Sequence, residues 1–102
     1  MEIIFSDEVK AYIKGLSNMT EKAQVAQYLN RQEALGHRIK EPVSKHLRDG
    51  INELRPGPHR LLFFYQKGQI VMVHVFRKKT RKTPSREVKT AIHKRSVWEQ
   101  HE

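Results

Sequence analysis

The chain of 102 residues contains no cysteine. This absence excludes disulfide bonds, thiolate catalysis and zinc sites built on cysteine, and it fits a protein of the reducing cytoplasm. Long hydrophobic runs are also missing, and none approaches the about 20 residues that a membrane-spanning helix needs. The opening stretch, MEIIFSDEVK, lacks the apolar core of a secretory signal. We therefore expect a cytoplasmic protein with no membrane segment.

Several motifs of well-known enzyme classes are missing too. The chain has no glycine-rich phosphate loop, no nucleophile elbow and no pair of carboxylates at an obvious catalytic spacing. The histidines are His37, His46, His59, His74, His93 and His101. None of them forms an i,i+4 pair on an expected helix or has an accompanying acidic set, so we expect neither a metal site nor a cofactor. His74, within a strongly apolar run, is expected in the core.

Acidic residues are scarce in the second half of the chain. Residues 55–102 contain twelve Lys or Arg and three Asp or Glu, within a formal net charge of +9 for the whole chain. Such an excess repels itself, and it commonly serves attraction to phosphate or to an acidic protein. We favour a nucleic-acid or ribonucleoprotein partner over a merely solvated basic face.

The length and the 37% apolar content predict one domain that spans residues 1–102. Residues 2–5 form a short apolar run that predicts a first strand, and Ser6 after it is a helix cap. Thr20 is the expected cap of a second helix that Gly36 ends. Apolar residues recur at helical spacing in both helices, at Val9, Tyr12, Ile13 and Leu16 and then at Val25, Ala26 and Leu29.

The apolar pattern then changes its period. The segments INEL, HRLLFFYQ and QIVMVHVF are rich in β-branched and aromatic residues and are separated by Pro-Gly-Pro and Lys67-Gly68, which predicts a three-stranded antiparallel meander. Residues 37–50 before the meander have a mixed pattern and predict only a turn. Thr83 as cap and Pro84 at the first helical position predict a closing helix that runs to about Trp98. The predicted fold is α+β in the order β-α-α-β-β-β-α, with helices packed on a twisted antiparallel sheet.

The two-residue loop Lys67-Gly68 fixes the register of the predicted hairpin. It places Arg60 opposite Val75, with Arg77 as the diagonal neighbour of Arg60 on the same face. Because two adjacent arginines repel each other, we expect a phosphate to lie between them. The open end of the strands would collect four cations, Arg60, Arg77, Lys78 and Lys79.

Candidate acid and base groups lie near the meander. Glu53 is expected either to brace a neighbouring arginine, Arg55 or Arg60, or to act as a base. His46 and His59 flank the first strand of the meander and are further acid/base candidates, because histidines near cations can titrate close to neutral pH.

Three motifs lie between Asp49 and Arg95, namely Gly50-x-x-Glu53-Leu54-Arg55, Arg60-Leu61, and Phe76-x-Lys78-Lys79-Thr80-x-Lys82-Thr83-Pro84 with Ala91 following. In these motifs the chain resembles the toxins of RelE/HigB-type type II toxin–antitoxin systems, specifically their phage-derived, HigB-like branch. The preceding strand and helical pair agree with this resemblance. It implies a RelE-like fold of the microbial-RNase type.

The resemblance also implies an activity and site residues. The family's usual activity is that of a metal-independent endoribonuclease, which cleaves messenger RNA in the ribosomal A site through attack of the 2′-hydroxyl on the adjacent phosphate. Arg60 matches the arginine that stabilises phosphate in RelE-like relatives, and Lys78 and Lys79 fall where relatives carry another basic or catalytic side chain. Glu41 matches, allowing one inserted residue, a carboxylate base of YoeB-like relatives. Four further cations are expected to bind RNA or the ribosome: Arg55, Arg77, Arg81 and Lys82.

The chain departs from RelE itself at two places. Ile51 and Glu53 stand where RelE carries lysines, and the tyrosine near the C-terminus of RelE has no clear counterpart. The RelE mechanism therefore cannot be carried over whole.

Partners also follow from the resemblance. It implies a helix-turn-helix antitoxin that neutralises the toxin, with operator DNA bound only through the complex of the two. Two alternatives stay open beside the nuclease. One is a ParE-like toxin that inhibits DNA gyrase without cutting, and the other is an inactive nucleic-acid-binding module.

Overall fold

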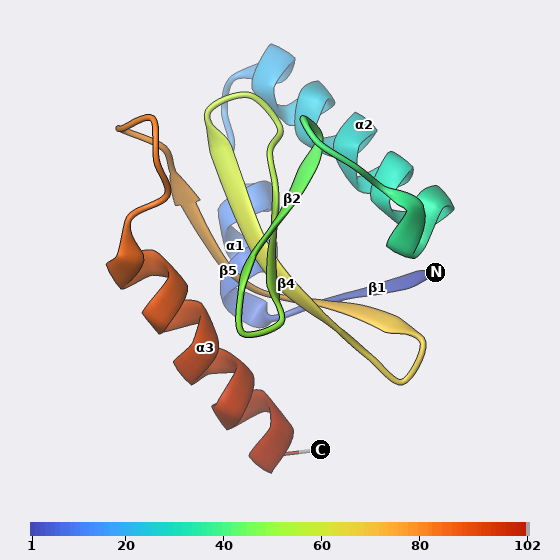
Figure 1. The fold of residues 1–102 in the computed structure, drawn as a ribbon. Coiled ribbons are helices and arrows are strands. Elements are labelled where there is room, and N and C mark those ends of the chain that lie inside the picture. Colours follow the sequence, from blue (N-terminus) through green and yellow to red (C-terminus); the bar gives the residue numbers. More distant parts are fainter. Residues whose placement is uncertain (102) are drawn as a thin grey trace.

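The computed structural model describes residues 1–101 as an α+β fold (Figure 1). Its elements are β1 (Glu2–Phe5), α1 (Asp7–Lys14), α2 (Met19–Leu35), a 3₁₀ turn (Gly36–Arg38), β2 (Ser44–Arg48), β3 (Ile51–Leu54), β4 (His59–Gln66), β5 (Gln69–Arg77) and α3 (Ser85–Gln100). The five strands form one sheet in the order β1-β5-β4-β3-β2. The α+β class is thus confirmed, and the arrangement is compatible with a RelE-like microbial-RNase fold. Within these residues no helix is both long and apolar enough to cross a membrane.

The sheet is mixed, whereas an antiparallel sheet was predicted. Strands β2 to β5 form antiparallel neighbours, but β1 runs parallel to β5. The helices α1 and α2 carry the chain from β1 to β2, at the opposite edge of the sheet. The strand β2 was missed altogether. It is an edge strand with mostly exposed residues, so it lacks the alternation of apolar and polar side chains that reveals a half-buried strand.

The helix ends confirm part of the sequence analysis. The Ser6 hydroxyl accepts a hydrogen bond from the Val9 amide, as expected of a cap, and Gly36, with a φ of 55°, ends α2. The cap of α2 is Asn18 rather than Thr20, since its side chain accepts the Glu21 amide at 3.0 Å. Thr83 is not the cap of α3 either, because its hydroxyl donates to Glu53 instead.

A one-residue bulge in β5 changes the predicted register. The hairpin starts as predicted, with Gln66 opposite Gln69, but the pairing shifts by one residue around Val73. Arg60 consequently lies opposite Phe76 rather than Val75, and Arg77 lies opposite His59. Since adjacent residues of a strand point to opposite faces, Arg60 and Arg77 do not share a face, and their predicted pairing is wrong.

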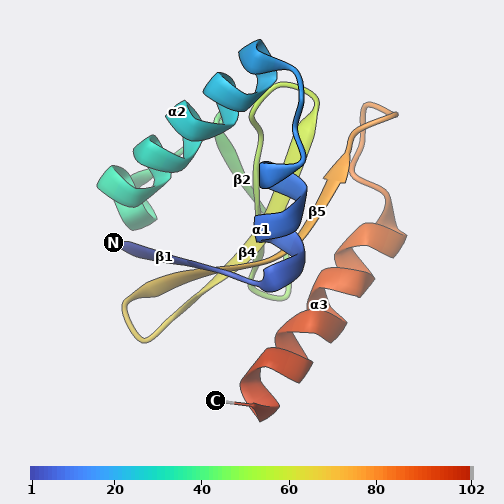
Figure 2. The same cartoon turned by 180° about the vertical axis from the view of Figure 1, so that it is seen from behind.

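Two apolar layers enclose the sheet, with α1 and α2 on one face and α3 on the other (Figure 2). The layer under α1 and α2 contains Val9, Leu54, Leu61, Phe63, Ile70, Met72 and Val75. The layer under α3 contains Ile51, Leu62, Phe64, Val71, Val73 and Ala91. His74 is buried as expected, but the bulge turns it toward α3, where its ring bonds to Glu87 at 2.9 Å and to Lys94 at 2.8 Å.

Replacing Phe63 tests the first of these layers. Phe63 is fully buried and stacks edge-on against Tyr65. Phe63→Ala should lower the free energy of unfolding by about 3–5 kcal/mol, because it leaves a cavity in the core. Urea unfolding followed by circular dichroism measures this change. Gln27→Ala, at an exposed position of α2, should shift it by no more than about 0.5 kcal/mol, and equal effects of the two changes would contradict the described core.

Candidate active site

A groove with strongly basic walls lies between β2 and the segment that leads into α3. Its volume is about 860 Å³. Six lining residues are Lys or Arg, namely Lys45, Arg48, Arg55, Arg81, Lys82 and Arg86. No Asp or Glu of the described residues lines it. We call this feature the basic groove.

A buried carboxylate supports one wall of the basic groove. Glu53 of β3 is fully buried, and one of its oxygens accepts a hydrogen bond from the Arg55 Nε at 2.8 Å. Its other oxygen accepts the hydroxyl of Thr83, in the loop before α3. The ion pair expected between Glu53 and Arg55 is therefore present. It fixes the guanidinium of Arg55 and ties the basic loop to the sheet.

Arg60 lies on the same sheet face as Glu53, but it is not open to solvent. Its exposed fraction is 9%, and its Nη1 donates to the carbonyls of Gly57 at 2.6 Å and His59 at 2.8 Å. Burial lowers the pKa of the Arg60 guanidinium, and the charge of Glu53 acts in the opposite direction. The expectation of an open strand end at Arg60 is thus wrong. The Pro-Gly-Pro loop supplies one of these carbonyls, at Gly57, and the first residue of β4, His59, supplies the other.

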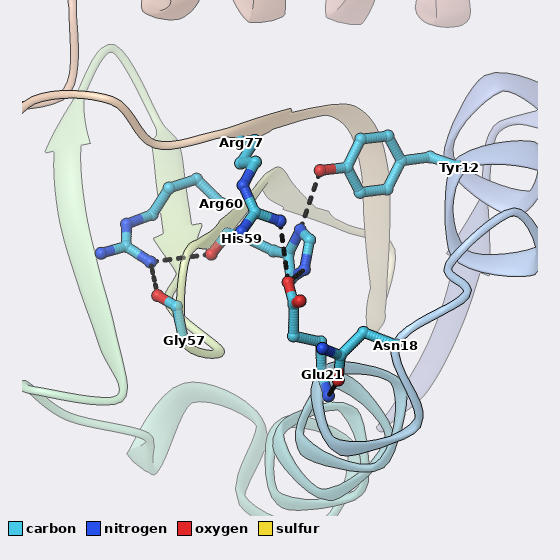
Figure 3. A network of polar contacts seen from close by, with 7 residues as sticks. All are labelled: Tyr12, Asn18, Glu21, Gly57, His59, Arg60 and Arg77. Atoms are coloured by element: carbon cyan, nitrogen blue, oxygen red, sulfur yellow. Dashed lines mark hydrogen bonds and ion pairs between the residues drawn. The ribbon is translucent and has the colours of Figure 1, made fainter.

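Arg77 belongs to a separate polar network on the α1/α2 face (Figure 3). Its Nη1 donates to Glu21 Oε1 at 2.8 Å, and the same oxygen lies 2.7 Å from Nε2 of His59. Nδ1 of His59 in turn meets the hydroxyl of Tyr12 at 2.8 Å. His59 is buried with both ring nitrogens engaged, so it is not the accessible loop histidine that we expected.

The other predicted site residues divide between the basic groove and its surroundings. His46 lines the groove and bonds to Asn52 at 3.1 Å, and the predicted RNA-binding residues Arg81 and Lys82 line it as well. Lys78 and Lys79 do not line it, since they precede Thr80, where the lining segment begins. Glu41 is exposed in the turn before β2 and lies outside it.

The sequence analysis missed several residues of the basic groove and of the polar network around Arg77. Lys45 and Arg48 were overlooked because β2 was not recognised as a strand, and Arg86 because it belongs to the closing helix. No sequence pattern indicated that Glu21 and Tyr12 belong to a polar network with Arg77, because the bulge in β5 determines on which face of the sheet Arg77 lies.

The basic groove can bind a polyanion. Lys and Arg side chains from three separate segments, namely β2, Arg55 after β3, and residues 81–86, line one space. Phosphate groups are the ligands that such clusters commonly hold. Among residues 1–101 no group of three or more His, Asp or Glu side chains is placed to hold a metal ion.

Fold and groove together define a small α+β protein with a groove lined by Lys and Arg side chains. The chain matches the family model described as Phage derived protein Gp49-like (DUF891) over residues 11–96, and it therefore belongs to this family. The family is in general one of RelE/HigB-like toxins, so the resemblance found in the sequence is confirmed at that level. A search of curated proteins finds no match.

The network around Glu21 predicts an acid-sensitive contribution to stability. The hydrogen bond from Arg77 is the main cause that lowers the pKa of Glu21 from its ordinary value of 4.5, and the bond from His59 adds to it. A lowered pKa in the folded state means that the stabilisation is fully present above about pH 4.5 and is lost as the pH falls further. Glu21→Gln should therefore destabilise the protein near pH 7, and its difference from the wild type should shrink below pH 4.5.

Urea unfolding at several pH values measures this difference. Glu33→Gln, at an exposed carboxylate of the same helix, is the control and should change stability near neutral pH by no more than about 0.5 kcal/mol. A difference between Glu21→Gln and the wild type that stays constant with pH would show that the ion pair adds nothing to folding.

Proposed function

We propose that this protein is the toxin of a type II toxin–antitoxin system and an endoribonuclease that cleaves messenger RNA in the ribosomal A site. One observation carries the proposal. In a chain of a toxin family, six Lys or Arg side chains line one groove that no described carboxylate enters. RNA is the polyanion whose cleavage arrests translation, and single-stranded RNA exposes its phosphates to such a groove.

The proposed reaction needs no group beyond the RNA and the protein. A base removes the proton of the 2′-hydroxyl, whose oxygen attacks the adjacent phosphorus. The bond from phosphorus to the 5′-oxygen breaks, and this oxygen takes a proton from an acid. Cations stabilise the extra negative charge on the phosphorane. We assign this stabilisation to Arg55, which lines the groove, with Arg60, whose charge interacts with that of Arg55, as a second positive charge.

His46 is the best supported acid or base among the candidates. It lines the basic groove, and a positioned imidazole is the side chain that most often transfers a proton in such a step. Glu53 is poorly suited, because both of its oxygens are occupied and it is fully buried. Glu41 is poorly suited because it lies outside the groove, although a ribosome-bound substrate that reaches the turn before β2 would bring it closer.

Cations outside the groove are proposed to bind the ribosome. Lys78 and Lys79 lie in the chain between the end of β5 and Thr80, where the groove lining begins, and they would contact ribosomal RNA beside the bound messenger. Arg77 is 57% exposed at its side chain although it is paired with Glu21. The ribosome would hold the messenger in the groove and thereby supply geometry that the isolated protein lacks.

The proposed partner in the cell is an antitoxin of the helix-turn-helix type. A toxin of this kind needs a neutralising partner, and a partner that binds DNA would bring the complex to operator DNA. The family match supports the antitoxin in general terms.

Salt dependence tests whether RNA binds in the basic groove. The affinity for a single-stranded RNA should fall linearly with the logarithm of salt concentration, because bound phosphates release counterions. Arg81→Ala should weaken binding and lower this slope by about one. Arg31→Ala, at an exposed position of α2 away from the groove, should leave the slope unchanged. Equal slopes for both variants would remove the groove as the RNA site.

Messenger RNA cleavage is the direct test of the proposed function. The protein is expressed from a tight promoter, and 5′ ends of messenger RNA are mapped by primer extension with translation running or blocked. We expect cuts at codon positions that disappear when translation is blocked. His46→Ala should reduce cutting by about 10²- to 10⁴-fold, as expected when an acid or base is lost. His93→Ala changes a histidine of α3 outside the basic groove and should cut normally.

Two other results would redirect the assignment. Growth arrest without any new 5′ ends would favour a gyrase-inhibiting toxin, and neither arrest nor cuts would leave a binding module. Cuts that persist in the His46→Ala variant would remove His46 as the proton-transferring group.

A further inference from the structure

The protein itself compensates only part of the positive charge in the basic groove. Arg55 is paired with Glu53 at 2.8 Å, and Arg48 is paired with Asp49 at 2.8 Å. Within residues 1–101 the other four lining cations form no ion pair with a carboxylate, namely Lys45, Arg81, Lys82 and Arg86. A ligand that neutralises the groove must therefore supply about four negative charges.

The groove has the size of a site for a small molecule. Its volume of about 860 Å³ lies within the range of about 300–1,000 Å³ that is usual for pockets with small ligands. Single-stranded RNA has one charge per phosphate, so it would need about four nucleotides to neutralise this space. A nucleoside triphosphate supplies about four charges on one molecule, because its terminal phosphate has about two and each of the others about one.

We propose that the basic groove binds a nucleoside triphosphate, with its consecutive phosphates among the four uncompensated cations and its base against the apolar part of the lining. This apolar part consists of Leu47 of β2, together with Pro84 and Val88 at the N-terminal end of α3. A base that packs on these side chains removes apolar surface from water. The groove thus offers contacts to both halves of such a ligand.

The N-terminal end of α3 adds hydrogen-bond donors to the same space. The cap of α3 is Pro84, which makes no side-chain hydrogen bond to the helix. The first amides of α3 therefore lack the acceptor that a Ser or Asp cap supplies. Ser85 and Arg86 of this first turn line the groove. A phosphate beside them would accept hydrogen bonds from backbone amides and from the guanidinium, and the helix dipole favours its charge.

The loop that contains Arg81 and Lys82 is held in place by two hydrogen bonds. The hydroxyl of Thr80 donates to the carbonyl of Lys82 at 2.8 Å, and the hydroxyl of Thr83 donates to the buried Glu53. Because these bonds restrict the loop before a ligand binds, less conformational entropy is lost on binding. The cations of this wall are thus positioned in advance for a compact anion.

A nucleotide in the basic groove would compete with messenger RNA. This consequence rests on the proposed function, because it requires RNA in the same groove. Binding of the nucleotide does not depend on it, since the four cations are present whether or not the protein cuts RNA. A nucleoside triphosphate would then be a competitive inhibitor of the nuclease.

Isothermal titration calorimetry of the full protein measures the binding directly. At low salt in the presence of EDTA, ATP should bind saturably at one site, and ADP and AMP should each bind at least about threefold more weakly than the nucleotide with one phosphate more. Excess Mg²⁺ should weaken ATP binding at least about threefold, because the metal cancels charges of the phosphates and no described carboxylate of the lining can hold it.

Two further ligands separate the nucleotide from other sources of consecutive phosphates. Methyl triphosphate has the same phosphates without a nucleoside, and it should bind at least about threefold more weakly than ATP, because the packing of the base is lost. Equal affinity would contradict the placement of the base. A tetranucleotide RNA with a 5′-triphosphate that binds at least about tenfold more tightly than ATP would make an RNA end the ligand instead.

Two matched substitutions locate the binding. Arg86→Ala should weaken ATP binding at least about tenfold, since a charged hydrogen-bond donor to phosphate is lost. Arg31→Ala removes the same side chain from an exposed position of α2 outside the groove and should leave the affinity unchanged. Both positions are exposed, so both variants should fold, and circular dichroism checks this.

Displacement of a labelled single-stranded RNA tests the competition. ATP should raise the apparent Kd for RNA in proportion to its own occupancy, and RNA binding that saturating ATP leaves unchanged would exclude a shared groove. Absence of saturable ATP binding in the calorimeter, or equal losses in the Arg86 and Arg31 variants, would overturn the nucleotide site whatever the cleavage experiment shows. Conversely, a protein that cuts no RNA but binds ATP through Arg86 would refute the nuclease and leave the nucleotide site in place.

Discussion

The pairing of β4 with β5 contains one extra residue, and most of the polar architecture depends on where that residue lies. The bulge at Val73 turns both Val73 and His74 toward α3, so every later residue of β5 faces the side opposite to the one that an unbroken strand would give. Val75 thereby joins the core beneath α1 and α2. Arg77 reaches Glu21 on that side, and Arg60 is left with Glu53 on the other.

The few carboxylates near the sheet determine which Lys and Arg side chains remain available to bind a polyanion. Glu53 holds Arg55, and Glu21 holds Arg77, each on its own face. Removing a buried partner such as Glu53 would leave an uncompensated charge, which commonly costs about 3–5 kcal/mol. Among the other lining cations, Arg48 pairs with its neighbour Asp49 at 2.8 Å, but no described Asp or Glu lines the groove itself. The surface there therefore keeps a positive potential that a polyanion can neutralise.

Features set by local sequence patterns could be predicted, whereas features that depend on the pairing register of distant residues could not. The α+β class, the meander and the helix end at Gly36 followed from local patterns, and they are confirmed. The basic character of the loop before α3 was also visible in the local sequence. The bulge in β5 could not be predicted, because no glycine or proline marks it within QIVMVHVF. The bulge alone invalidated the pairing of Arg60 with Arg77. The missed strand β2 concealed the wall of the basic groove that contains Lys45 and Arg48.

The parallel pairing of β1 with β5 also constrains the order in which the chain can fold. Glu2 pairs with Gln69 and Phe5 with Met72, so the first strand to be synthesised has no partner until most of the chain exists. The meander of β2 to β5 closes through short loops, whereas β1 closes a loop of more than sixty residues. Contacts of such long range slow folding. During synthesis the apolar side chains of β1 must therefore stay exposed to solvent, or pack temporarily against α1 and α2, until β5 has been synthesised.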